Sequence, residues 1–150
     1  MNSQNGTTFL PGAVAGIRTG TSRFTGEERN SVRDAGGLFI VFEGPDGSGK
    51  TMQAKLLAAH LRESGFVVRE TREPGGTPLG NAIRQILLSR DDLDIDGVAE
   101  MFLLAAARSQ HVREVIAPAL GNGDIVVCDR FIDSSYAYQG GGRQIPMETL

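Results

Sequence analysis

A glycine-rich loop is the clearest chemical feature of this 150-residue sequence. Residues 44–51 match G-x-x-x-x-G-K-[ST], with Gly44, Gly49, Lys50 and Thr51 at the defining positions. Glycines let backbone N–H groups turn towards a phosphate, the lysine adds positive charge, and the threonine hydroxyl can bind Mg²⁺. An apolar run precedes the loop and a helical pattern follows it, so that a helix dipole would assist. We therefore predict that the loop, including Pro45, Asp46, Gly47 and Ser48, binds phosphate.

Three arginines are candidates for binding an anionic substrate. Arg72 and Arg130 each follow a predicted strand, and the carboxyl ends of parallel strands meet at one edge of a sheet. Both guanidinium groups would then face the same cleft as Lys50. Arg108 lies on the apolar face of a long predicted helix, where a charge needs a partner. A structural ion pair or a snorkelling side chain would explain Arg108, but the other two arginines favour a substrate contact.

Two aspartates are further candidate site residues, one within the loop and one at the end of a predicted strand. Asp129 ends an apolar strand, where phosphoryl-transfer proteins hold Mg²⁺, so we predict that Thr51 and Asp129 bind the metal. A turn-forming aspartate is the alternative. Asp46 would be repelled by the phosphates of a bound nucleotide, so we expect it to face a second substrate or Mg²⁺. We expect His60 and His111 on helix surfaces, and Cys128 to be an unreactive thiol in a strand.

Composition argues against several classes of protein. The net charge of −3 does not indicate a nucleic-acid-binding surface. The single cysteine fits a reducing compartment. No apolar run is long enough to span a bilayer, and the N-terminus lacks the apolar segment of a signal peptide. We therefore expect a cytoplasmic protein with no membrane or nucleic-acid partner.

The order of strand and helix patterns predicts the fold class. Apolar strands are expected at 38–43, 66–71 and 125–128. The helix that follows the glycine-rich loop is expected to end at Gly65. A second helix has Thr77 as N-cap and Pro78 at its first position. A long helix covers 98–120 and a short one 133–139, with a flexible joint at 140–142 and a further helix starting at 146. This order predicts an α/β protein with a parallel sheet and right-handed crossovers.

Residues 1–37 differ in composition from the remainder. They are rich in Gly, Ser, Thr and Asn and show neither a helical nor a strand period. Such a segment cannot bury enough apolar surface to offset the entropy of ordering it. We expect a disordered leader or a start codon placed too early at 1–37, followed at 38–150 by the N-terminal part of a domain built around the phosphate loop.

Four motifs resemble those of the thymidylate kinase family. They are the strand and loop at 39–51, the sequence R-E-P-G-G-T at 72–77, A-A-R-S-Q-H-V at 106–112, and D-R-F with S-S-Y-A-Y-Q-G at 129–140. The resemblance covers Gly37 to Leu150 and implies a three-layer P-loop NTPase fold of the nucleoside monophosphate kinase type. It implies ATP-dependent phosphorylation of dTMP to dTDP with Mg²⁺, by a protein that dimerises through the long helix.

The resemblance also implies roles for individual residues. The loop at 44–51 would hold ATP, and Lys50, Arg130 and Asp46 would be catalytic. Asp46 would contact the sugar 3′-hydroxyl. Other expected contacts to dTMP are Arg72 and Arg130 on the phosphate, Arg108 on the thymine edge, Ser135 and Tyr138 near the 2′ position, Gln139 close by, and Pro74 in a cis peptide with Glu73. Two arginines on the acceptor, with Lys50 and Mg²⁺ on the donor, would reduce the repulsion between two anions.

The sequence departs from the family at three places. Leu104 occupies the position of an aromatic residue that stacks on thymine, so stacking would come from Phe102 or Tyr138. Gly47 stands where some members carry a catalytic arginine, and members with glycine supply the arginine from a lid. The family continues beyond Leu150 into that lid, two strands and a helix. We therefore expect an open apolar edge at the first strand, poor solubility and negligible activity of the 150-residue chain alone.

Two other functions fit the same residues. A different P-loop kinase of nucleoside monophosphates could use the same arginines. A nonenzymatic nucleotide-binding remnant would bind ATP or dTMP without turnover.

Overall fold

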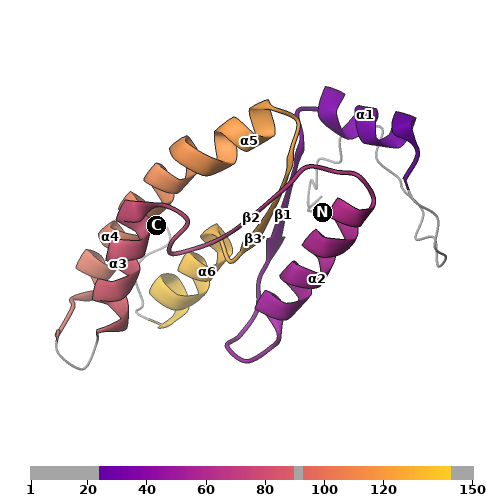
Figure 1. Ribbon diagram of the computed structural model, residues 1–150. Helices are drawn as coiled ribbons and strands as arrows, with labels where there is room; N and C mark the ends of the chain where they lie inside the picture. The colour runs from indigo at the N-terminus through magenta and orange to yellow at the C-terminus, as the bar shows by residue number, and fades with distance from the viewer. Residues whose placement is uncertain (1–23, 90–92, 143–150) are drawn as a thin grey trace, which may run out of the picture.

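A three-stranded parallel sheet forms the centre of the computed structural model, which describes residues 24–89 and 93–142 (Figure 1). Its strands are β1 (Leu38–Phe42), β2 (Val68–Arg72) and β3 (Ile125–Asp129), in the order β1-β3-β2. The predicted parallel α/β class is therefore confirmed. The last strand in sequence lies in the middle, so that both earlier strands end beside it.

Burial explains why β3 takes the central place. Ile125, Val126, Val127 and Cys128 are each at most 2% exposed, as expected for an apolar run covered on both faces of a sheet. Edge strand β1 is only partly buried, and Leu38 is 45% exposed.

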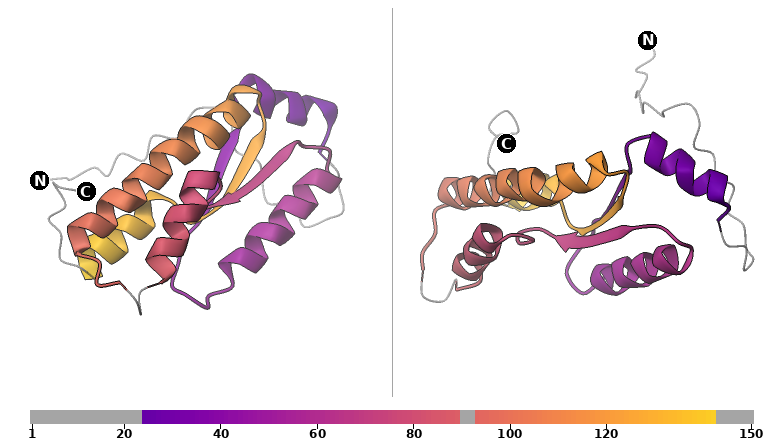
Figure 2. Two further views of the ribbon diagram at one scale, coloured as in Figure 1. Left: turned by 60° about the vertical axis from the view of Figure 1, so that its left-hand side comes forward. Right: turned by 45° about the horizontal axis from the view of Figure 1, so that its top comes forward.

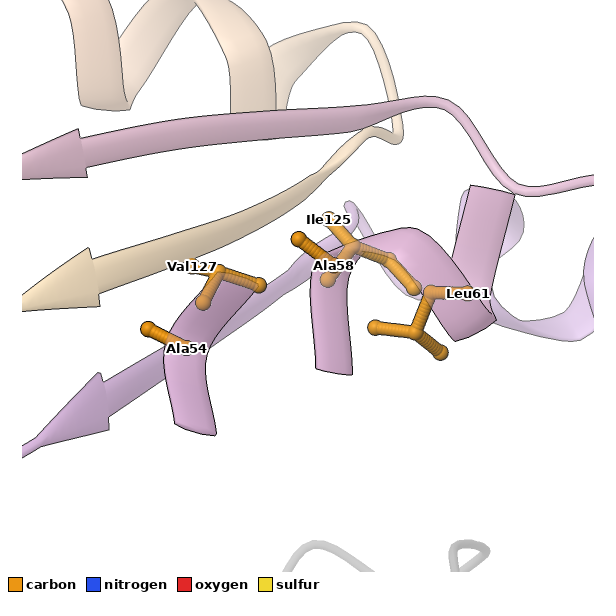
Figure 3. Packing of buried hydrophobic residues seen from close by; sticks show 5 residues of the cluster. All are labelled: Ala54, Ala58, Leu61, Ile125 and Val127. Atoms are coloured by element: carbon orange, nitrogen blue, oxygen red, sulfur yellow. The ribbon is translucent and has the colours of Figure 1, made fainter. Parts of the chain in front are cut away.

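Helices cover both faces of the sheet and make three layers (Figure 2). On one face, α2 (Lys50–Glu63) packs Ala54, Ala58 and Leu61 against Ile125 and Val127 (Figure 3). On the other face, Val126 packs against Ile116 and Ala119, since its side chain points opposite to those of its neighbours in the strand. As predicted, Gly65 stops α2: it follows the Ser64 C-cap and adopts a positive φ of 88°.

The helices beyond β2 position most of the polar residues discussed below. Helix α3 (Pro78–Leu88) begins as predicted, with the Thr77 hydroxyl accepting a hydrogen bond from the Gly80 N–H at 3.0 Å. It packs Ile83 and Leu87 against Ala107 of α4 (Gly97–His111).

The predicted long helix is present as three successive helical segments. Helix α4 continues into a π-helical turn, η1 (Val112–Ile116), and then into α5 (Ala117–Gly121). Within the turn, the Ala117 N–H donates to the Val112 carbonyl, five residues back. The next residue, Pro118, has no N–H to donate, which favours a local change of helical geometry here. None of the helices in the described ranges is long and apolar enough to cross a membrane.

Helix α1 (Gly26–Asp34) lies within the segment for which we expected a disordered leader, so that expectation is wrong for these residues. No residue of α1 is fully buried, although Val32 packs against the core cluster from a partly buried position. Thr25 and Glu28 form a reciprocal capping box. Arg29 donates to the carbonyls of Phe24 and Ser64 at 2.6 and 3.2 Å, and the Phe24 ring packs edge-on against Phe66. Residues 1–23 lie outside the described part of the chain.

The predicted flexible joint at 140–142 is also wrong. Helix α6 (Ile132–Ser135) continues into a second π-helical segment, η2 (Tyr136–Gly142), which includes those glycines. A buried contact from Gln139 to α4 ties this segment to the remainder of the fold. The helix predicted from residue 146 lies outside the described residues.

Candidate functional site: two adjoining cavities at the strand ends

The glycine-rich loop joins β1 to α2, as predicted. Gly44, Gly47 and Gly49 have φ angles of 148°, 78° and 86°, which glycine adopts without a steric penalty. Gly49 is the N-cap of α2, so the helix dipole points at the loop. The Lys50 ammonium lies over the loop and donates to the Pro45 carbonyl at 2.6 Å. The loop thus gathers N–H groups and a positive charge where a phosphate can bind.

Thr51 and Asp129 meet beside the loop. The Thr51 hydroxyl donates to Asp129 Oδ2 at 2.5 Å, although 78 residues separate the two. Hydroxyl and carboxylate oxygens suit Mg²⁺, which keeps several waters and phosphate oxygens in its shell. The described residues contain no cluster of three or more His, Cys, Asp or Glu side chains that could hold a metal. This pair therefore fits a magnesium ion that arrives with a nucleotide, and does not form a closed metal site.

Arg130 links the loop to the segment after β3. Its guanidinium forms an ion pair with Asp46, donates to the Ser134 hydroxyl at 3.1 Å and lies 5.4 Å from the centre of the Tyr138 ring. Its backbone has a φ of +71°, which is unfavourable for a residue with a side chain. Its N–H donates to the Phe42 carbonyl at 3.0 Å, which ties this backbone to the end of β1. Asp46 is 89% exposed, so it can exchange Arg130 for another partner.

Glu43 provides a second link at the end of β1. Its carboxylate accepts from the backbone N–H groups of Phe131 and Ser134 at 2.7 and 3.3 Å, and from the Ser134 hydroxyl at 2.5 Å. Sequence analysis assigned no role to Glu43. Its position directly after an apolar strand was the available signal.

Arg108 belongs to a buried hydrogen-bond network. Its Nε donates to Glu73 Oε2 at 2.7 Å, and a terminal nitrogen donates to the Ser135 hydroxyl and the Phe131 carbonyl at 2.8 and 3.2 Å. The structural ion pair considered for Arg108 is therefore present. Arg108 also lines a cavity, so the ion pair and a ligand contact are compatible.

The prediction that His111 is a surface residue is wrong, because its side chain is fully buried. Its Nδ1 lies 3.1 Å from Glu73 Oε1, and its Nε2 lies 2.5 Å from the Thr71 hydroxyl. A carboxylate can only accept, so Nδ1 carries a proton. His111 thus supports Glu73, which in turn holds Arg108. The Glu73–Pro74 peptide is cis, as expected from the family resemblance.

Two cavities meet at this edge of the sheet. One, of about 510 Å³, is lined by the loop residues together with Lys50, Thr51, Arg72 and Asp129. The other, of about 650 Å³, extends between the segment after β3 and helices α3 and α4. Asp46, Glu73, Arg84 and Arg130 line both cavities. A group bound in one cavity would therefore adjoin a group bound in the other.

Most predicted acceptor-site residues line the larger cavity. These are Asp46, Pro74, Leu104, Arg108, Arg130, Ser135, Tyr138 and Gln139. Arg72 lines the smaller cavity, beside Lys50. Side chains from all three strand ends are thus brought together, as their places in the sequence predict.

Arg84 is a site residue that sequence analysis missed. It lies on α3, donates to the Pro74 carbonyl at 3.2 Å and lines both cavities. Burial lowers the pKa of its guanidinium, and nearby Arg72 and Arg130 lower it further, whereas Asp129 opposes the shift. Three arginines close enough to interact indicate a site for an anion. The amphipathic pattern of α3 did not indicate that Arg84 belongs to the site, because an arginine next to Ile83 would equally fit a solvent-exposed face of the helix.

Comparison with known proteins decides the family. A family model described as thymidylate kinase matches residues 42–150. The chain belongs to the thymidylate kinase family. A thymidylate kinase of Pseudomonas savastanoi pv. phaseolicola is 52% identical over 114 residues, which are 76% of this chain and 54% of the relative. One from Exiguobacterium sp. is 53% identical over the same shares.

A solved structure supports the same family. The thymidylate kinase of Ehrlichia chaffeensis is 45% identical, with a TM-score of 0.70 over 75% of this chain and 60% of that protein. The P-loop kinase fold implied by the four motifs is thus confirmed. This chain spans about half the length of the curated thymidylate kinases it matches.

Because Leu104 replaces the aromatic residue expected from the family resemblance, another aromatic side chain would have to stack on a base in the larger cavity. Tyr138 and Phe131 line the larger cavity, and Arg108 lies 5.3 Å from the centre of the Phe131 ring. Phe102, the other aromatic considered for stacking, is 64% exposed and lines neither cavity. Phe131 was not considered in the sequence analysis.

Proposed function

We propose that this chain forms the substrate-binding part of a thymidylate kinase that transfers the terminal phosphoryl group of ATP to dTMP. One observation carries the proposal: a phosphate-loop cavity and a second, nucleotide-sized cavity share Asp46, Arg84 and Arg130. Two phosphorylated ligands would meet at this boundary, which is what phosphoryl transfer requires.

The charges at the boundary suit this reaction. Lys50 and the N-terminus of α2 would face the donor phosphates. Arg72, Arg84 and Arg130 would face the acceptor phosphate and offset the repulsion between two anions. Thr51 and Asp129 would hold Mg²⁺, which when bound neutralises charge on the donor phosphates.

Roles in the larger cavity follow from its lining. Asp46 would exchange its ion pair with Arg130 for the sugar hydroxyl of the acceptor. Ser135 and Tyr138 would lie along the sugar, with Arg108 at the base and Leu104 and Pro74 as its apolar walls. The other family expectations belong to the same proposal: a homodimer in the complete protein, a catalytic arginine from a lid in place of Gly47, and a cytoplasmic location.

Formation of dTDP from dTMP and ATP with Mg²⁺ tests the proposal, measured on a protein of the length of its relatives because negligible activity is expected of the 150-residue chain alone. Lys50→Met should lower kcat by about 10²–10³-fold. Asp129→Asn should raise the Mg²⁺ concentration needed for half-maximal activity by about tenfold or more, whereas the matched variant Asp133→Asn, at an exposed residue of α6, should not. Comparable turnover of AMP or UMP would favour another nucleoside monophosphate kinase. Calorimetric binding of ATP or dTMP without turnover by the complete protein would favour a nonenzymatic role.

A further inference from the structure

Glu100 has no place in the roles above, although it forms a buried polar pair with Gln139 in the larger cavity. Glu100 of α4 is 4% exposed and Gln139 of η2 is 2% exposed, and the Gln139 Nε2 donates to Glu100 Oε1 at 2.9 Å. Both residues line the larger cavity. Glu100, Leu104 and Arg108 recur every fourth residue of α4 and therefore lie on one side of the helix.

This contact fixes the orientation of the Gln139 amide. A carboxylate only accepts hydrogen bonds, so the NH₂ group of Gln139 must face Glu100 and its carbonyl must face elsewhere. That carbonyl oxygen, Oε1, is buried and has no hydrogen-bond partner, and no other side-chain N or O atom of the described residues is in this state. A buried acceptor without a donor is unfavourable, so a ligand N–H placed here would be stabilised.

The same cavity offers the complementary group. The Arg108 guanidinium can only donate, so it suits a carbonyl oxygen on a ligand. A donor from Arg108 and an acceptor from Gln139 match a pyrimidine edge with a carbonyl next to an N–H, as in uracil and thymine. Cytosine presents the reverse pattern, an amino donor next to a ring-nitrogen acceptor.

We infer that Glu100 is a positioning residue that locks the Gln139 amide and thereby makes the cavity select 2,4-dioxopyrimidine nucleotides against cytosine nucleotides. The inference rests on the proposed function, because it assumes that the base of the acceptor occupies the larger cavity. Glu100 does not touch the ligand in this scheme. Its role is to prevent rotation of the Gln139 amide.

Calorimetric titration with dUMP and dCMP tests the inference, because neither nucleotide carries the 5-methyl group of thymine. The unsubstituted protein should bind dUMP about 10- to 100-fold more tightly than dCMP. Glu100→Gln keeps the size of the side chain but lets either end of its amide face Gln139. The ratio of the two affinities should then fall at least about fivefold, mainly because dCMP binds more tightly.

A matched control and a double-mutant cycle separate positioning from a structural role. Gln110 donates to Glu114 on the exposed surface of the same long helix, so Glu114→Gln removes the same kind of contact and should leave the ratio unchanged. In a Gln139→Met background, Glu100→Gln should have no further effect on the ratio. The Gln139→Met cycle also gives a readout if Glu100→Gln alone folds poorly.

The outcomes separate the inference from the proposed function. A dUMP-to-dCMP ratio that is the same in Glu100→Gln as in the unsubstituted protein overturns the inference. So does an effect of Glu100→Gln that persists in the Gln139→Met background. Tight dTMP binding without discrimination against dCMP overturns the inference alone, whereas failure to bind dTMP overturns the proposed function and the inference with it.

Discussion

At the scale of single residues, the site contains a strained backbone conformation that the surrounding contacts maintain. Arg130 is the clearest case: a left-handed backbone costs a residue with a Cβ about 1–2 kcal/mol relative to glycine. Its hydrogen bond to Phe42 and its ion pair with Asp46 hold it there. Since backbone strain clusters at functional sites, this position supports a ligand-binding role for Arg130.

A comparison of two substitutions at Arg130 tests this strain. Arg130→Gly should unfold with a free energy about 1 kcal/mol higher than Arg130→Ala, because only glycine relieves the positive φ. Both variants should lose affinity for dTMP, since both remove the guanidinium. Urea unfolding measures the first effect and calorimetry the second. Equal stability of the two variants would contradict the claim of strain.

Cys128 provides a second residue-scale prediction. Burial raises the pKa of its thiol, and the nearby Glu73, Asp129 and Glu43 carboxylates raise it further. The thiolate is the reactive form, so native Cys128 should stay protonated at pH 8. Because it is the single cysteine, iodoacetamide labelling reports on it alone. Labelling should be at least about 100-fold slower in native protein than in urea, and equal rates would refute the assignment.

Elements differ in how strongly their ends are tied to the core. Thr77 caps α3 from a buried position, only 3% exposed, and α3 supplies Arg84 to both cavities. Thr25 caps α1 by the same chemistry, but α1 buries none of its residues. The two caps therefore allow one kind of interaction to be compared in two settings.

Removing each cap hydroxyl should have unequal effects on stability. Thr77→Val should lower the free energy of unfolding by about 1–2 kcal/mol, because the buried Gly80 N–H loses its acceptor. Thr25→Val should change it by less than about 0.5 kcal/mol, because α1 can fray without opening the core. Urea unfolding of both variants checks this. A larger loss at Thr25 would mean that α1 is integral to the domain.

At the scale of the whole molecule, the edges of the sheet matter most. Among the described residues, β1 and β2 each pair only with β3, and the first residue of β1, Leu38, is 45% exposed. An exposed apolar edge strand can pair with another chain and so promotes aggregation. The predicted poor solubility of the 150-residue chain has this edge as its structural basis and stays a prediction.

A charge at the edge should reduce self-association. Leu38→Lys should raise the fraction of the 150-residue chain that elutes as monomer in size-exclusion chromatography, since lysine disfavours edge-to-edge pairing. Leu56→Lys is a matched control, because Leu56 is also exposed, at 56%, but lies on helix α2 and not on a strand of the sheet. If both variants behave alike, general surface polarity and not the β1 edge controls association.

How far the sequence predicts the molecule depends on the range of each interaction. The glycine-rich loop, the Thr77 cap, the Gly65 stop and the parallel sheet were predictable, because each rests on residues adjacent in sequence or on one period. The four motifs also identified the family. The residues that follow the three strands were expected to lie close together, because parallel strands place their carboxyl ends at the same edge of a sheet.

Tertiary structure alone decided the contacts between distant segments. Glu43 meets Phe131 across 88 residues, and Arg108 meets Glu73 across 35, and no local pattern encodes such pairs. For the same reason His111 was expected at the surface, although packing against β2 buries it. The sequence by itself determined which chemistry is available: a glycine-rich loop, a hydroxyl and a carboxylate that suit Mg²⁺, and arginines. Only the fold decided which side chains share a cavity, because burial and hydrogen bonding between distant residues depend on how helices pack on the sheet.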